Sequence, residues 1–99
     1  MNGLKQIKVE VCAELLSVVA NPVRLKILTL LVQGEVSVTT VASHVGSSQS
    51  AVSQHLAKLR RKTLVASRRD AQTIYYSCRS PIVFALLQTL KEISNKLPD

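Results

Sequence analysis

Two short amphipathic segments that meet at Gly46 limit the fold of this chain more than any other feature. Residues 38–45 and residues 47–62 each carry apolar side chains at helical spacing. Serine or threonine before such a run is typical of a helix N-cap, and glycine after it is typical of a C-cap. The candidate caps are Ser37 or Thr39 for the first segment and Ser47 or Ser48 for the second. The pattern predicts two helices joined by a tight turn, which is a helix-turn-helix.

The second of these helices has two unlike faces at 100° per residue. Val52, Leu56 and Leu59 form an apolar side that must belong to the core. The opposite side combines hydroxyls, a small alanine, amides and cations, which suit base edges flanked by phosphates. In a helix-turn-helix the second helix lies in the major groove of DNA with its N-terminal residues on the bases. The predicted DNA-facing residues of this helix are Ser48, Gln49, Ser50, Ser53, Gln54, Lys58 and Arg61, with Ala57 between them.

The charge of the chain indicates the same kind of partner. Thirteen Lys and Arg residues against six Asp and Glu residues give a formal net charge of +7. Seven of those cations fall within residues 58–79, where Asp70 is the only acid. Residues 36–69 contain no acid at all, although an exposed helix ordinarily carries Glu–Lys pairs for support. A solvated charged face explains this poorly, so we expect a polyanion as partner.

Sparse proline and glycine residues divide the rest of the chain into helices. Apolar residues recur at helical spacing over residues 4–20. A second helix, capped by Asn21, begins at Pro22 and stops at Gly34. A last helix covers residues 81–97 and has a broad apolar face. A hydrophobic content of 46% is high for so short a chain, so we expect part of this apolar surface to lie in a subunit interface.

Two runs of β-formers, residues 64–69 and 73–78, flank a polar turn that lacks glycine, which predicts a β-hairpin. A hairpin after a helix-turn-helix is a wing. Arg68 and Arg69 near its tip, and Gln72 in the turn, are predicted to reach phosphates or an adjacent minor groove. An ordinary surface hairpin is the alternative. The 99 residues are therefore predicted to form one domain, mainly α with a small hairpin, in the order ααααββα of a winged helix-turn-helix.

Three stretches together resemble the ArsR family of bacterial winged-helix repressors, in its NolR- and HlyU-like branch: "NPVRLKILTLL", "SQSAVSQHLAKLR" and "RRDAQTIYYS". The resemblance covers residues 13–93. It implies a homodimer, built from the first and last helices, that binds an imperfect inverted repeat in double-stranded DNA near a promoter. The alternative that the same branch implies is a derepressor, which activates genes by displacing a silencing protein from DNA.

The resemblance also indicates where a sensor would lie. Many relatives carry a Cys-x-Cys pair in the third helix or an Asp/His set along the last one. The corresponding stretches here, "EVSVTTVA" and "SPIVFALLQTLKEIS", contain neither cysteine nor histidine. Thiol-switched relatives carry cysteines where this chain has Thr29 and Ser94. We therefore expect no cofactor, and no metal at these family sites.

Cys12 and Cys78 are the only thiols, and their spacing fits neither a zinc module nor a disulfide scaffold. Both are expected to be buried small hydrophobes, with a redox switch between them as the alternative. His55 lies beside the apolar side of its helix and is expected to be structural or phosphate-facing. Neither it nor His44 is expected to bind a metal.

The sequence disfavours several other classes of function. No window approaches the roughly 18 uninterrupted apolar residues that span a bilayer, and the start of the chain lacks a secretion signal, so we expect a cytoplasmic protein without membrane attachment. Recognisable nucleophile–base pairs, glycine-rich phosphate loops and paired carboxylates are missing, so we do not expect an enzyme. Outside DNA binding, the alternative is a protein-interaction module that uses the apolar outer helices.

Overall fold

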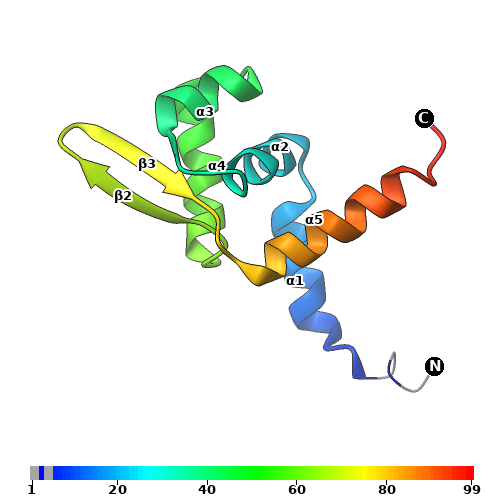
Figure 1. The fold of residues 1–99 in the computed structure, drawn as a ribbon. Coiled ribbons are helices and arrows are strands. Elements are labelled where there is room, and N and C mark those ends of the chain that lie inside the picture. The colour runs from blue at the N-terminus through cyan, green and yellow to red at the C-terminus, as the bar shows by residue number, and fades with distance from the viewer. Residues whose placement is uncertain (1–2, 4–5) are drawn as a thin grey trace.

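The structure is a computed structural model that describes residue 3 and residues 6–99. Over these residues it contains five helices and one antiparallel sheet with the strand order β1-β3-β2. α2, α3 and α4 gather in the centre, the β2–β3 hairpin projects on one side, and α1 and α5 extend on the other (Figure 1). The elements are α1 (Val9–Val19), α2 (Pro22–Leu31), β1 (Val36–Ser37), α3 (Val38–Val45), α4 (Gln49–Arg61), β2 (Ala66–Asp70), β3 (Thr73–Ser77) and α5 (Pro81–Ser94).

Side-chain caps begin four of these helices, and they confirm the predicted starts of α2, α3, α4 and α5. Asn21 accepts two backbone N–H bonds at the start of α2. Ser37, Ser48 and Ser80 accept one each at the starts of α3, α4 and α5. Gly46 ends α3 with φ at 70°, a left-handed conformation that costs glycine little. The expected helix-turn-helix is therefore present in α3, the Gly46 turn and α4, and the hairpin after it completes a winged helix-turn-helix.

Three helices are shorter than their apolar patterns predicted. α1 begins at Val9 rather than residue 4; residues 4 and 5 lie outside the described residues, and residues 7–8 are not helical. α2 ends at Leu31, before a turn that leads into β1, and α5 ends at Ser94 rather than at residue 97. Apolar periodicity marks the buried side of a chain, and it does not mark where backbone hydrogen bonds stop.

The strand β1 was not expected from the sequence. It is only two residues long, and it pairs with β3 through Val36 opposite Tyr76 and Ser37 opposite Tyr75. Two residues are too few to show the alternation by which strands are found. Because Ser37 both ends β1 and caps α3, the sheet is joined directly to the helix-turn-helix.

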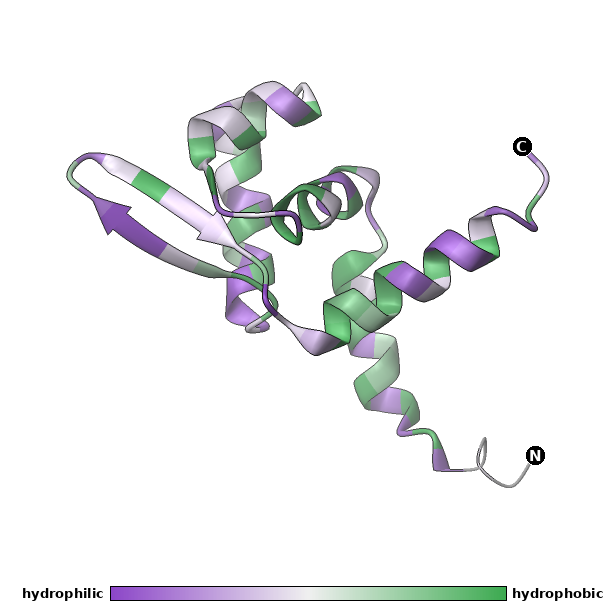
Figure 2. Ribbon diagram, in the orientation of Figure 1, coloured by the Kyte–Doolittle hydropathy of each residue, from purple (hydrophilic) through white to green (hydrophobic). Residues whose placement is uncertain are grey.

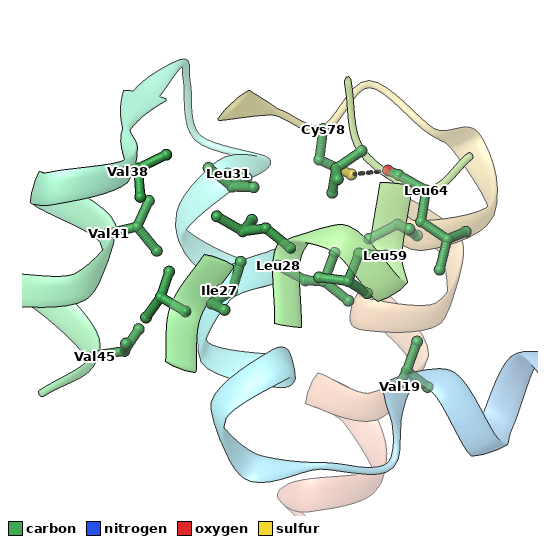
Figure 3. Close-up of a cluster of buried hydrophobic side chains, with 14 of the residues drawn as sticks. Val19, Ile27, Leu28, Leu31, Val38, Val41, Val45, Leu59, Leu64 and Cys78 are labelled. Carbon is green, nitrogen blue, oxygen red and sulfur yellow. Dashed lines mark hydrogen bonds between the residues drawn. The ribbon is translucent and has the colours of Figure 1, made fainter. Parts of the chain in front are cut away.

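The core lies between α2, α3, α4 and the start of α5 (Figure 3). As predicted, Val52, Leu56 and Leu59 of α4 are fully buried. They pack among apolar side chains of the other helices, including Ile27, Leu28, Leu31, Val41 and Val83. This packing fixes the rotation of α4 about its axis and leaves its polar side facing outward.

The outer helices contribute little to this core. α1 buries only Val19 of its own residues, and α5 buries only Val83. Apolar bands run along both helices where they project from the body (Figure 2). The apolar side chains exposed on them are Val9, Val11, Leu16, Ile82, Phe84 and Ile93. In the described part of the chain, no helix has the length and apolarity needed to cross a membrane.

Candidate nucleic-acid interface

A groove of about 280 Å³ separates the N-terminal half of α4 from the β2–β3 hairpin, which we call the wing. Gln49 and Ser53 come from α4, and Gln72 comes from the turn at the tip of the wing. These three were predicted to face DNA, and the fold brings them together. The remaining lining residues are Val38, Thr39, Thr73, Ile74 and Tyr76.

The polar side of α4 divides into two parallel rows. Gln49, Ser53, Ala57 and Arg61 are spaced four residues apart, and they line the hollows between α4 and the sheet. Ser50, Gln54 and Lys58 form the next row around the helix and are exposed. At 100° per residue, Ser50 and Gln54 lie opposite the buried apolar side, so they project farthest from the core.

Arg69 lies on the side of the wing that faces α4. It pairs across the hairpin with Ile74, and Ser67 pairs with Tyr76. Side chains of directly paired residues share one face of a sheet. Since Ile74 and Tyr76 both line the groove, Arg69 is on the groove face and places a cation opposite the polar side of α4.

Arg68 does not reach this groove. It lies in the middle of β2 on the opposite face, paired with Tyr75. Its guanidinium donates to both carboxylate oxygens of Glu35, at 2.8 and 2.7 Å, and lies 4.6 Å from the centre of the Tyr75 ring. The hydrogen bond from Arg68 lowers the pKa of the Glu35 carboxyl. Four of the ten residues predicted to face DNA are cations, and among the described residues Arg68 is the one of these four that an ion pair already holds.

The turn of the wing has two residues, Ala71 and Gln72, between the paired Asp70 and Thr73. Ala71 has φ at 56°, a left-handed conformation that usually selects glycine or asparagine. Alanine is disfavoured there, which is why the sequence did not reveal the type of turn. The tight turn directs Gln72 toward the groove.

A buried arginine that the sequence analysis overlooked holds α4 in place. Arg24 of α2 is only 9% exposed. Its Nε donates to the carbonyl of Val18 at the end of α1, and its Nη1 lies 3.3 Å from Nδ1 of His55 on α4. Arginine only donates, so Nδ1 accepts and the proton of the neutral imidazole is on Nε2. The sequence does indicate that Arg24 is buried, because Arg24 lies on the same side of its helix as Ile27 and Leu28.

The structure confirms a structural role for His55. Burial lowers the pKa of its imidazole, and the charges of Arg24 and Lys58 lower it further. The unfolded chain has an ordinary histidine pKa of 6.5. As the pH falls, its imidazole therefore binds a proton at a higher pH than the imidazole of the folded protein does. The stability that comes from neutral His55 is therefore fully present above the pKa of the unfolded chain. It is lost as the pH falls from that value through the lower pKa of the folded protein.

We expect the free energy of unfolding to fall between about pH 7.5 and about pH 5.5, and to fall less in His55→Gln. Glutamine can accept from Arg24 through its amide oxygen but does not titrate. Urea unfolding of both proteins at the two pH values measures the difference. An identical pH dependence in the two proteins would assign the loss to other groups.

The two cysteines differ in environment. Cys78 is buried as expected, and its thiol donates to the carbonyl of Leu64 at 3.2 Å (Figure 3). Burial raises the pKa of this thiol, which disfavours the reactive thiolate. Cys12 was predicted to be buried, and this prediction is wrong for the single chain, where Cys12 is exposed because most of α1 has no packing partner. Within residues 3 and 6–99, no three His, Cys, Asp or Glu side chains are grouped as a metal site would require.

Comparison with known proteins agrees with this geometry. Residues 21–67 match the model described as "Bacterial regulatory protein, arsR family". The nodulation protein NolR of Rhizobium meliloti is 55% identical over 85% of this chain and 69% of its own. The transcriptional activator HlyU of Vibrio cholerae is 46% identical over 80% of this chain and 73% of the HlyU chain.

Solved structures show the same fold. The crystal structure of NolR from Sinorhizobium fredii covers 87% of this chain and 86% of its own, at 55% identity and a TM-score of 0.83. The crystal structure of the transcriptional repressor BigR from Xylella fastidiosa matches 94% of this chain and 95% of the BigR chain, at 30% identity and a TM-score of 0.84. The extent and identity of these matches show that the chain belongs to the arsR family of bacterial regulatory proteins.

Proposed function

We propose that this chain is a sequence-specific repressor of transcription that binds an imperfect inverted repeat as a homodimer. Membership of the arsR family makes it a DNA-binding transcriptional regulator. The observation that carries the finer proposal is the exposed polar side of α4, which is held rigidly by a buried apolar side and flanked by a wing that carries Arg69.

The roles of the side chains follow from their places. Ser50 and Gln54 project farthest from the core and read base edges, with Gln49 and Ser53 beside them on the wing side. Cations at the end of α4 and on the wing bind phosphates and fix the register. These phosphate ligands are Lys58, Arg61 and Arg69, with Gln72 at the tip of the wing and Ser48 at the start of α4 as neutral donors.

The homodimer follows from the outer helices. α1 and α5 expose apolar side chains that the single chain leaves without a partner. Pairing these helices with those of a second copy buries this surface and sets the two copies of α4 side by side. Each subunit, residues 1–99, acts as one winged-helix domain, and the dimer works in the cytoplasm, where bacterial promoters lie.

The proposal is tested by selecting bound sequences from a random DNA pool at physiological salt. We expect a roughly palindromic site whose half-sites lie about 10 bp apart, because a two-fold dimer places its reading helices one duplex turn apart. Binding should weaken steeply as salt is added. Binding that neither selects a sequence nor responds to salt would instead indicate a protein-interaction module.

A derepressor is the second candidate, favoured by the 46% identity to HlyU, which is named as an activator. Both functions use the same DNA-binding surface, so the outcome at a promoter separates them. A repressor lowers transcription from its own operator in a reaction that contains only polymerase and this protein. A derepressor leaves that reaction unchanged and raises transcription only when a silencing protein is added.

A further inference from the structure

Three side chains join the three strands of the sheet on the face that points away from α4. Tyr75 in the central strand lies opposite Ser37 of β1 and opposite Arg68 of β2. Arg68 extends across the Tyr75 ring and binds Glu35, just before β1, with two hydrogen bonds. We call Glu35, Arg68 and Tyr75 the wing clamp.

The clamp connects the edge strand β2 to the segment that leads into α3. β2 pairs only with β3, and it is an edge strand of the sheet. Glu35 precedes β1, whose last residue caps α3. The bidentate pair therefore ties β2 to the helix-turn-helix as well as to its neighbouring strand.

The ion pair is too exposed to be explained by stability. The Arg68 side chain is 53% exposed and that of Glu35 is 36% exposed. Pairs with this much solvent access contribute little to the free energy of unfolding. What the pair does achieve is geometric, since a bidentate contact backed by an aromatic ring fixes the direction of the guanidinium.

We propose that Glu35 and Arg68 are positioning residues: they set the angle of the wing against α4 and withhold Arg68 from DNA phosphates. This inference rests on the proposed DNA-binding function. A free Arg68 on the wing is a phosphate ligand for any sequence, which strengthens nonspecific binding. The clamp thus favours the operator over other DNA, with Arg69 as the cation of the wing that reaches the duplex.

The test compares wild type with Glu35→Gln, Arg68→Met and the double variant. Affinity is measured for the selected operator and for a scrambled duplex of equal length and composition, each over a range of salt concentrations. Asp99→Asn is the matched control, because it removes the same charge outside both the wing and the outer helices. Thermal unfolding verifies that every variant is folded.

Glu35→Gln is expected to bind the scrambled duplex severalfold more tightly, with a salt dependence steeper by about one counterion per subunit, and to lose part of its preference for the operator. Arg68→Met should keep the wild-type salt dependence and bind the operator more weakly. The double variant should bind the scrambled duplex no more tightly than wild type does, which would assign the gain in Glu35→Gln to Arg68. Asp99→Asn should leave both affinities near those of wild type.

A flatter salt dependence in Arg68→Met would overturn this inference and leave the proposed function intact, because it would make Arg68 a direct phosphate ligand. An unchanged preference for the operator in Glu35→Gln would do the same. Equal gains in affinity for the scrambled duplex in Glu35→Gln and Asp99→Asn would also overturn it, because they would assign the gain to net charge. A wild-type protein that binds neither duplex overturns the proposed function, and this inference with it.

Discussion

Leu16→Glu is expected to convert the dimer to monomers and to weaken binding to an inverted-repeat operator by about 10²–10⁴-fold. Leu16 lies on α1 and is 53% exposed in the single chain, so the fold of one subunit does not depend on it. In the proposed dimer it is buried, and a carboxylate there would lose its hydration without gaining a partner. Sedimentation measures the oligomeric state, and titration of the operator measures the affinity.

Thr29→Glu is the matched control for this substitution. Thr29 is exposed on α2, outside both outer helices, and its replacement changes the net charge by the same amount. We expect this variant to remain dimeric and to lose little affinity. Binding of Leu16→Glu to a single half-site should also stay near that of wild type. A Leu16→Glu protein that remains dimeric would place the subunit interface elsewhere.

The parts of the fold that could be predicted are those set by neighbours in the sequence. The apolar side of α4 and the caps Ser37 and Ser48 depend on residues within four positions of one another. Helical periodicity is such a local property, so the exposed polar side of α4 was predictable as well. The division of α4 into a buried apolar side and an exposed polar side was therefore predicted from the sequence, and contact of the polar side with DNA stays a prediction.

The remaining features depend on partners that are distant in the chain. Arg24 meets His55 over 31 positions, and Arg68 meets Glu35 over 33. The helical stripe of α2 indicates that Arg24 is buried, but no periodicity indicates its partner, and for the same reason Arg68 was predicted to be free for DNA. The exposure of Cys12 has a related cause, because the neighbours of α1 in one chain do not cover it.

These distant contacts matter for the proposed function because they decide which cations are available. The local pattern treats Arg68 and Arg69 as equivalent, yet alternation along β2 places them on opposite faces. One is bound by a carboxylate and the other faces the groove. Under the proposed function, the number of phosphates that the protein neutralises therefore depends on its tertiary structure as well as on its net charge.

Gln54→Ala is expected to cost about 1–3 kcal/mol per half-site on the selected operator, or about 2–6 kcal/mol for the dimer. Gln54 projects from the middle of the polar side of α4, and its amide can donate and accept at one base pair. Its removal should abolish discrimination at that base pair only. The measurement is the affinity of each protein for a panel of operators that differ by single base pairs.

Arg69→Ala is compared with Gln54→Ala because it removes a proposed phosphate ligand rather than a side chain proposed to read a base. A phosphate ligand carries no sequence information, so its loss should weaken every operator in the panel by one common factor and flatten the salt dependence by about one counterion per subunit. Gln54→Ala should leave the salt dependence unchanged and make one base pair of each half-site interchangeable. If Gln54→Ala instead weakened all operators equally, the amide would be holding the DNA backbone, and base recognition would belong to Ser50 and the row that lines the groove.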